Sequence, residues 1–561
     1  MIQKTLIPIL CLAALVGCGK NSSSEPTTPT EKPVASTSPL CSAWLQESSD
    51  QPSLSSCELS LQDHSESLHS EITKILPTKN GYFTLQNLLI NNNDPAEKVG
   101  LNAAIDKLKD EYRVVYFDKV SGQSQEILRV ASRIYDAEVY RGRLYVLFKD
   151  KSFLKLMTYR LGGEKKEFLI SMGHFKKQDC RRLKYDKPCL ADAAKQNPEL
   201  LAKFKETQGY VTAGHPEFDI HGYQTSAADL AINKKTGEVF VYAEEVFNLK
   251  GNIYILKEMP NQFVVKKRTT IFENYGSLYP VPIGLTGGTE LFGFLRFSRE
   301  IKRHLEVLST GEAVVTYMTI PRRHYFDDKV NFSNFKTLEK VMQLPFDKMT
   351  STASPDLTED DIRQAYTVHY FVAKISPSGK LLYHKAAAVV GGGYDSPHSP
   401  MREADGVGYV TISRLVGSDA NTSLYKTKLL QWDVKQGVPI REVDLPVYSK
   451  GVAEVTLATQ LSPSGDRIYM TGNSGFTQNP NGMSLYTPGM AFLLSFDLNT
   501  QDSKVQYYRL SDRKDYGSSL ALQDDKLLLG VGYKGPLTHS GDDDIREGYQ
   551  SSGIVEIILN P

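Results

Sequence analysis

Short apolar runs separated by polar turns dominate the chain from about residue 112 to its C-terminus. The runs are rich in Val, Ile, Leu, Tyr and Phe, the residue types that favour β-strands. Several turns between them end in glycine, where a positive φ closes a hairpin. The pattern predicts an all-β domain over residues 109–561. Representative strands are expected at 114–117, 144–148, 239–242, 253–256, 493–496, 527–529 and 554–558, with glycine turns at 118–122, 233–237 and 433–437.

Parts of this β pattern repeat along the chain. Ser-Pro-Ser-Gly occurs at 376–379 and again at 462–465, each time directly after an apolar strand. Degenerate repetition of four-stranded units over so long a stretch is typical of a β-propeller, here of about seven to eight blades. A run of β-sandwich modules is the alternative. The last strand, at 554–559, is expected to close the ring by joining a blade begun by early strands, which removes an open sheet edge.

Two stretches resemble a known repeat. Residues 371–383 (FVAKISPSGKLLY), with three glycines after them at 391–393, resemble the SBBP-type β-propeller repeat of bacterial surface proteins. Residues 461–475 (LSPSGDRIYMTGNSG) resemble the turn, strand and Thr-Gly-Asn portion of the same repeat. The other units depart from the pattern. The resemblance implies a propeller fold and no particular activity, because propellers carry many unrelated functions.

Residues 41–108 differ from the β domain and predict a partly helical N-terminal segment. The sequence at 94–97 (DPAE) combines an N-cap residue, a proline at the first helical position and an acid at the third. The helix that it begins is expected to run towards Lys109. A shorter helix is expected over 66–76, ended by Pro77.

Two insertions interrupt the strands, at 174–208 and at 321–368. In the second, Thr358 as N-cap and Asp361 three residues later predict a capped helix. Insertions of this size on a propeller rim often carry binding residues.

The first residues have the parts of a secretory signal, expected over residues 1–17. Lys4 supplies the positive charge and residues 6–15 the apolar stretch. Those residues are too few for a helix that crosses a bilayer core of roughly 30 Å, which needs about 20. The run at 15–18 (LVGC) resembles a bacterial lipobox. The resemblance implies cleavage before Cys18 and acylation of that cysteine, which would anchor the chain to a membrane.

In lipoproteins of bacteria with two membranes, an aspartate after the lipidated cysteine usually retains the protein in the inner membrane. Here that position is Gly19, so the resemblance implies an outer-membrane lipoprotein that faces the periplasm or the exterior. Residues 18–40 are mostly Ser, Thr, Pro, Lys and Glu. Such a segment cannot bury enough apolar surface to order itself, and it is expected to be a disordered tether.

Charge and cysteines narrow the function classes. The formal net charge is +0, which argues against a nucleic-acid partner. Four cysteines remain beside the leader and the lipid site: Cys41, Cys57, Cys180 and Cys189. An even count in an oxidising compartment predicts disulfides, and proximity in sequence favours Cys41–Cys57 and Cys180–Cys189. A zinc site is the rival, but Cys-x₂-Cys spacing is absent.

Candidate chemistry is sparse, and no catalytic residue, metal ligand or cofactor is assigned. The basic run over 174–187 suits an anionic headgroup or an acidic partner, or is a solvated loop. The acids at 542–547 lack EF-hand spacing. His215 and His221 lie about 20 Å apart on an extended strand, too far to share a metal unless the chain turns. Phosphate loops, nucleophile elbows, His-Glu-x-x-His motifs, the tryptophan motifs of quinoproteins and sialidase Asp boxes are all absent from the sequence.

These observations favour a lipid-anchored envelope propeller that binds or scaffolds a protein or envelope component. The alternative is an envelope enzyme, a glycan or peptide hydrolase or lyase with its site in the propeller channel. A structural surface protein is a third possibility. A channel lined by convergent acids and histidines would favour the enzyme, and a flat aromatic face would favour binding.

Overall fold

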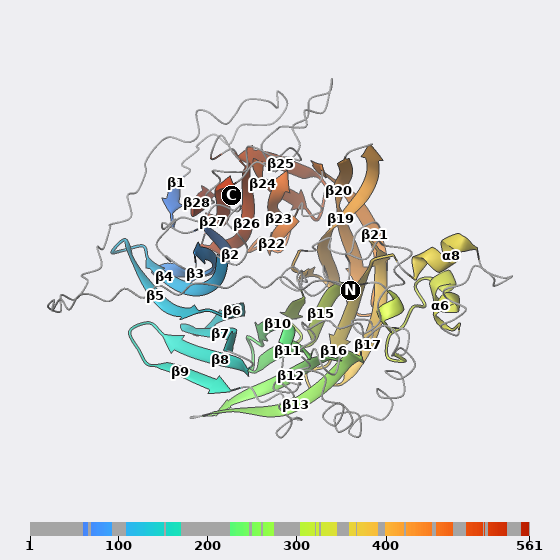
Figure 1. The fold of residues 1–561 in the computed structure, drawn as a ribbon, viewed down its shortest axis with the longest axis horizontal. Coiled ribbons are helices and arrows are strands. Elements are labelled where there is room, and N and C mark those ends of the chain that lie inside the picture. Colours follow the sequence, from blue (N-terminus) through green and yellow to red (C-terminus); the bar gives the residue numbers. More distant parts are fainter. Residues whose placement is uncertain are drawn as a thin grey trace, which may run out of the picture.

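Seven antiparallel four-stranded sheets surround a central axis in the computed structural model (Figure 1). The chain is therefore a seven-bladed β-propeller, within the predicted seven to eight blades, rather than a run of sandwiches. The structure describes residues 60–64, 69–91, 108–150, 153–169, 225–245, 250–259, 262–273, 303–319, 321–324, 327–344, 358–365, 367–390, 399–419, 422–450, 456–474, 490–508, 510, 514–524, 526–535 and 551–559.

The blades are numbered in chain order, and the first strand of each lines the channel. Blade 1 contains β2 (His69–Pro77), β3 (Gly81–Asn91), β4 (Leu108–Asp118) and β5 (Gln123–Val130). Blade 2 contains β6 (Ile134–Tyr140), β7 (Arg143–Asp150), β8 (Phe153–Arg160) and β9 (Lys165–Leu169). Blade 3 contains β10 (Thr225–Ile232), β11 (Val239–Glu245), β12 (Lys250–Met259) and β13 (Gln262–Glu273). Blade 4 contains β14 (His304–Val307), β15 (Ala313–Thr319), β16 (His369–Ile375) and β17 (Leu381–Val389).

The remaining blades follow the same plan. Blade 5 contains β18 (Arg402–Ala404), β19 (Val407–Asp419), β20 (Thr422–Asp433) and β21 (Val438–Lys450). Blade 6 contains β22 (Thr456–Leu461), β23 (Arg467–Ser474), β24 (Met490–Asp497) and β25 (Ser503–Tyr508). Blade 7 contains β26 (Lys514–Gln523), β27 (Lys526–Gly535) and β28 (Ser551–Ile558), and its outermost strand is β1 (Ser60–Asp63).

The ring is closed by strands from both ends of the described chain. β1 pairs antiparallel with β28, with Leu61 opposite Val555 and Gln62 opposite Ile554. Blade 7 therefore combines three C-terminal strands with one N-terminal strand. This pairing confirms the prediction that the last strand joins an early one, and it covers the edge of β28.

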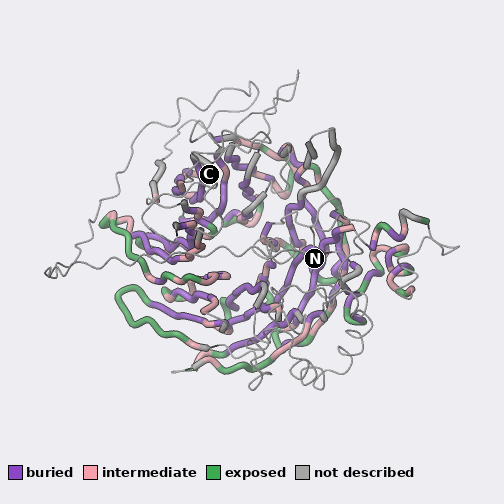
Figure 2. Tube along the Cα trace, in the orientation of Figure 1, coloured by how far each residue is buried: buried purple, intermediate pink, exposed green. Residues whose placement is uncertain are grey.

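Apolar side chains fill the spaces between all seven pairs of neighbouring blades. On β7, Leu144 and Val146 pack towards blade 1, whereas Tyr145 and Leu147 pack towards blade 3. A strand buried on both faces is apolar at consecutive positions, which explains the runs in the sequence. Buried residues follow the inner strands, while exposed residues gather on outer strands such as β5, β9 and β13 (Figure 2).

One predicted helix is wrong. Residues 66–76 were expected to contain a helix, but the structure has strand β2 there. Pairing with β3 and burial of Ile72 between blades 1 and 7 override the local helix preference. Strands β1 to β3 all lie within 41–108, so the blades begin before residue 109. The helix expected from Asp94 lies outside the described residues.

The predicted glycine turns are confirmed. Gly122, Gly237 and Gly437 all have φ between 68° and 75°, in the left-handed region that glycine tolerates. Each turn begins with an Asp or Asn whose side chain accepts backbone N–H groups two and three residues ahead. Both Ser-Pro-Ser-Gly turns have the same kind of glycine, with φ of 82° at Gly379 and 75° at Gly465.

The insertion at 321–368 joins β15 to β16, and its described residues form three short helices. They are η6 (Pro321–His324), α6 (Lys336–Met342) and α8 (Glu359–Gln364). Thr358 and Asp361 form the predicted capping box at the start of α8. Both α-helices lie outside the ring beside blades 4 and 5 (Figure 1). Leu338 and Val341 of α6 are buried and belong to the apolar cluster that also fills the space between blades 3 and 4.

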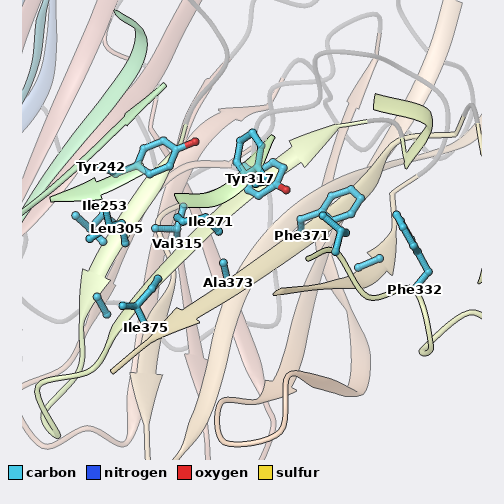
Figure 3. Packing of buried hydrophobic residues seen from close by; sticks show 14 of the residues in the cluster. Tyr242, Ile253, Ile271, Leu305, Val315, Tyr317, Phe332, Phe371, Ala373 and Ile375 are labelled. Atoms are coloured by element: carbon cyan, nitrogen blue, oxygen red, sulfur yellow. The ribbon is translucent and has the colours of Figure 1, made fainter. Parts of the chain in front are cut away.

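A buried aromatic cluster fastens this insertion to blade 4. The Tyr317 hydroxyl lies 2.9 Å from Nε2 of His324 and 2.6 Å from Nε2 of His384. Phe371 stacks on the Tyr317 ring with centroids 5.2 Å apart, and Figure 3 shows the two rings within the core. The hydroxyl has one proton to donate, so it donates to one imidazole and accepts from the other, and the accepting imidazole must be neutral.

Candidate ligand-binding channel

The innermost strands of all seven blades enclose a cavity of about 710 Å³. Its lining is polar and charged rather than a flat aromatic surface. The charged side chains that carry the following argument are Lys74, Asp136, Glu138, Asp229, Glu306 and Arg402. They come from five different blades, so only the closed ring brings them together.

Lys74 joins blade 1 to blade 2. Its Nζ lies 2.7 Å from Oδ1 of Asp136 and 3.0 Å from Oε1 of Glu138. Lys234, after β10, bonds the other oxygen of Glu138 at 3.2 Å. Burial alone would lower the pKa of Lys74, but the charges of Asp136 and Glu138 outweigh it and raise that pKa above its usual value. The ammonium group therefore stays charged.

Asp229 joins blades 2, 3 and 4. Its Oδ1 accepts the N–H of Leu230 at 2.9 Å, and its Oδ2 accepts the N–H of Leu305, on β14, at 2.6 Å. Burial, followed by the charge of Asp136 and a hydrogen bond with it, raises the pKa of Asp229 well above its usual value. Asp229 therefore holds its proton more tightly than an ordinary carboxyl group does.

Arg402 joins blades 4, 5 and 6. Its Nη1 lies 2.9 Å from Oε2 of Glu306, and its Nε donates to the carbonyl of Thr459 at 3.2 Å. The Thr459 hydroxyl donates to the carbonyl of Pro400 at 2.6 Å. Burial raises the pKa of Glu306 although the charge of Arg402 opposes this change.

Serine side chains join blade 7 to blade 1. The hydroxyls of Ser518 and Ser519, both on β26, donate to the carbonyl of Ile72 at 2.5 and 3.2 Å. Ser70 and Ser552 share a further hydrogen bond of 2.7 Å across the same junction. Polar contacts therefore connect the blades in the order 7, 1, 2, 3, 4, 5 and 6 around the cavity.

Several acids converge on the channel, and its described lining also includes one histidine, His304. Every charged side chain of the described lining nevertheless has an interaction partner. Both oxygens of Asp229 are occupied by backbone N–H groups. Engaged in this way, the carboxyls hold strands together, which suits a rigid frame better than proton transfer to a substrate.

None of the residues assigned to a site from the sequence falls in the described part. This applies to the lipid site at Cys18 and to the four cysteines Cys41, Cys57, Cys180 and Cys189. The basic run at 174–187, His215, His221 and the acids at 542–547 also lie outside the described residues. Lipidation and both disulfides therefore stay predictions.

Sequence reasoning missed the channel residues. Asp136, Asp229 and Glu306 are acids within the short first strand of a blade, and 134–140 (IYDAEVY) contains a second one, Glu138. A charged residue inside the first apolar strand of successive repeats is the signal that points to them. Within the described ranges, no group of three or more His, Cys, Asp or Glu side chains has a metal-binding arrangement. Among the described helices, none combines the length and the apolar character needed to cross a bilayer.

Comparison with known proteins assigns this chain to no family. No family model and no curated protein matches the chain. Saccharomyces cerevisiae Sqt1 is similar at 10% identity and a TM-score of 0.37, over 89% of this chain and 98% of that chain. The β-propeller domain of the Trilobed protease from Pyrococcus furiosus is similar at 8% identity and a TM-score of 0.34, over 88% and 96%. A prolyl endopeptidase is similar at 10% identity and a TM-score of 0.29, over 83% and 55%.

Proposed function

We propose that this protein is a binding module of the bacterial cell envelope, anchored to the outer membrane by a lipid on Cys18. The tether at 18–40 holds the propeller away from the bilayer, and the ring presents its loops to a protein or envelope partner. The resemblance of residues 15–18 to a lipobox supports the anchor. Tethering raises the local concentration of the module at the membrane and so favours binding there.

One observation supports the binding role: the charged side chains of the described channel lining already have interaction partners within the protein. The acids that converge there are held by cations or backbone N–H groups, and together they connect the blades around the ring. A frame of this kind keeps the loops at fixed positions, which lowers the entropy cost of binding a partner.

Capture from intact cells tests this proposal. Cells that express the tagged full chain are crosslinked, and the captured proteins are identified by mass spectrometry. The test variant is Cys18→Ala, and the matched control is Cys11→Ala, which alters a cysteine of the leader. We expect one recurrent envelope component with the wild type and with Cys11→Ala, and its loss with Cys18→Ala. No specific partner, or equal capture with all three chains, would contradict an anchored binding module.

A hydrolase with its site in the channel is the second candidate. The raised pKa of Asp229 beside Asp136 favours it, because a carboxyl group that keeps its proton can act as a general acid. Turnover of envelope glycans or peptides by the wild type and its abolition by Asp136→Asn, with the fold retained, would establish the enzyme. Turnover that survives this substitution would place the activity elsewhere.

A further inference from the structure

A second cavity, of about 470 Å³, lies between blades 2 and 3 and shares no lining residue with the channel. Five cations line it: Arg141, Arg143, Arg160, Lys257 and Lys266. Among the described lining residues, two carboxylates, Glu238 and Glu258, accompany them. We infer that this cavity, called the interblade groove below, binds a phosphate-bearing ligand.

The charges within the interblade groove do not balance. Arg143 pairs with Glu258, and Lys266 pairs with Glu238. Arg141, Arg160 and Lys257 are exposed and have no carboxylate partner among the described residues. The described lining therefore has an excess of three positive charges, whereas the formal net charge of the chain is +0. A concave positive surface of this kind concentrates anions.

A tight turn of the backbone places Arg141 at this groove. It occupies the first position of the tight turn between β6 and β7, with φ of 49°, and Gly142 follows with φ of 68°. Arginine has no intrinsic preference for this left-handed conformation, so its presence calls for a reason. Its guanidinium lies 5.0 Å from the centre of the Tyr140 ring. The Tyr140 hydroxyl donates to the carbonyl of Lys234 at 3.2 Å, which anchors the ring to blade 3.

Two arginines also face each other across one sheet. Arg143, on β7, is directly opposite Arg160, on β8. Like charges at such positions repel each other. Glu258 neutralises Arg143 only, and its other oxygen accepts the Tyr145 hydroxyl at 3.1 Å. An anion beside Arg160 would relieve the remaining repulsion.

The side chains indicate the class of anion. Guanidinium groups donate two parallel hydrogen bonds to phosphate oxygens, and Arg141 and Arg160 are both available to do so. The cavity is large enough for a phosphate or pyrophosphate with a small attached group. This site is independent of the anchor and of the partner proposed above, so its failure would leave that proposal standing.

Titration calorimetry of the full chain with inorganic pyrophosphate tests the site. The test variant is Arg141→Gln, Arg160→Gln and Lys257→Gln combined. The matched control is Lys380→Gln, Lys435→Gln and Lys504→Gln, which removes three exposed lysines from blades 4, 5 and 6. We expect the wild type and the control to bind within about twofold of each other, and the test variant to bind at least roughly tenfold more weakly. Thermal unfolding should show that both variants keep the fold.

Vesicles distinguish the source of the phosphate. The wild type and the test variant are compared on phosphatidylcholine vesicles with and without phosphatidic acid. A preference for the acidic vesicles that the test variant loses would identify a lipid headgroup as the ligand. Loss of pyrophosphate binding without a vesicle effect would identify a soluble phosphate compound. Absence of pyrophosphate binding by the wild type at low salt, or equal weakening in the control, would overturn the inference.

Discussion

Asp229 shows how single residues hold the ring together. One carboxyl group accepts backbone N–H groups from β10 and β14 and contacts Asp136 on β6. Each of these strands belongs to a different blade. The backbones of different blades do not pair with each other, so the side chain of Asp229 connects them instead. Burial and the neighbouring acid raise the pKa of Asp229, which makes its contribution depend on pH.

The substitution Asp229→Asn should therefore have a pH-dependent effect on the free energy of unfolding. The folded state binds the proton of Asp229 more tightly than the unfolded chain does. The stabilisation is complete below the unfolded pKa of about 3.9 and is lost as pH rises through the raised folded value. Asparagine has nearly the same shape as aspartate and does not titrate, so its contribution does not change with pH. Its side chain, however, has one carbonyl oxygen to accept the N–H groups of Leu230 and Leu305. We expect the variant to be less stable at pH 5, by about 1–3 kcal/mol, and to approach the wild type towards pH 8.

Urea unfolding at intervals between pH 5 and pH 8 measures this difference. Asp502→Asn, at an exposed position before β25, is the control and should show a constant difference from the wild type. A constant difference for Asp229→Asn as well would contradict a raised pKa at that residue.

Some structural elements are stabilised by contacts between residues that are close in sequence, and these elements can be predicted locally. The glycine turns and the capping box of α8 are of this kind, because all the partners lie within a few residues. The docking of the insertion at 321–368 is different. It depends on His324, Tyr317 and His384, which come from three separate elements and meet only in the folded core.

Acid should loosen this insertion before it affects the carboxylates. Burial lowers the pKa of His384 to about 3 and that of His369 to about 4. The pKa of each histidine in the folded state lies below the ordinary value of 6.5. Its contribution to the free energy of unfolding is therefore complete above pH 6.5 and falls as the pH drops below that value. Each histidine contributes a loss of up to about 1.4 kcal/mol per pH unit.

Unfolding free energies between pH 7 and pH 5 check this expectation. In that window, His384→Gln should show a shallower pH dependence than the wild type, because one buried imidazole is gone. His369→Gln should reduce the slope by a similar amount. Identical slopes in all three proteins would show that these histidines do not govern the acid response.

The whole molecule depends on closure between blade 7 and blade 1. Seven apolar layers lie between blades, and each needs both neighbours to stay dry. β1 supplies the outermost strand of blade 7 and covers the edge of β28. His64, just after it, bonds the carbonyl of Ser552 and the hydroxyl of Tyr82, both at 3.0 Å.

Removal of residues 1–64 should therefore destabilise the ring, whereas removal of residues 1–58 should not. The longer truncation exposes the edge of β28 and opens the junction with blade 1. We expect its thermal midpoint to fall by several degrees and its light scattering to rise, because an unpaired strand edge promotes association. Equal midpoints for the two truncations would show that β1 does not close the ring.

Sequence alone was sufficient for features that depend on short-range chemistry. The strands, the glycine turns at 118–122 and 433–437 and the capped helix after Thr358 were predictable, because each depends on periodicity or on adjacent residues. The propeller class followed from repetition of such units. The lipid site at Cys18 is also a property of local sequence, and it stays a prediction.

Tertiary structure alone decided what lies around the channel and in the interblade groove. Lys74 meets Asp136 across 62 positions of sequence, and Glu306 meets Arg402 across 96. No local pattern encodes such a pairing, because it depends on the angle at which successive blades pack. The same reason explains the error at 66–76, where ring closure and pairing with β3 made a strand of a segment whose local preference is helical.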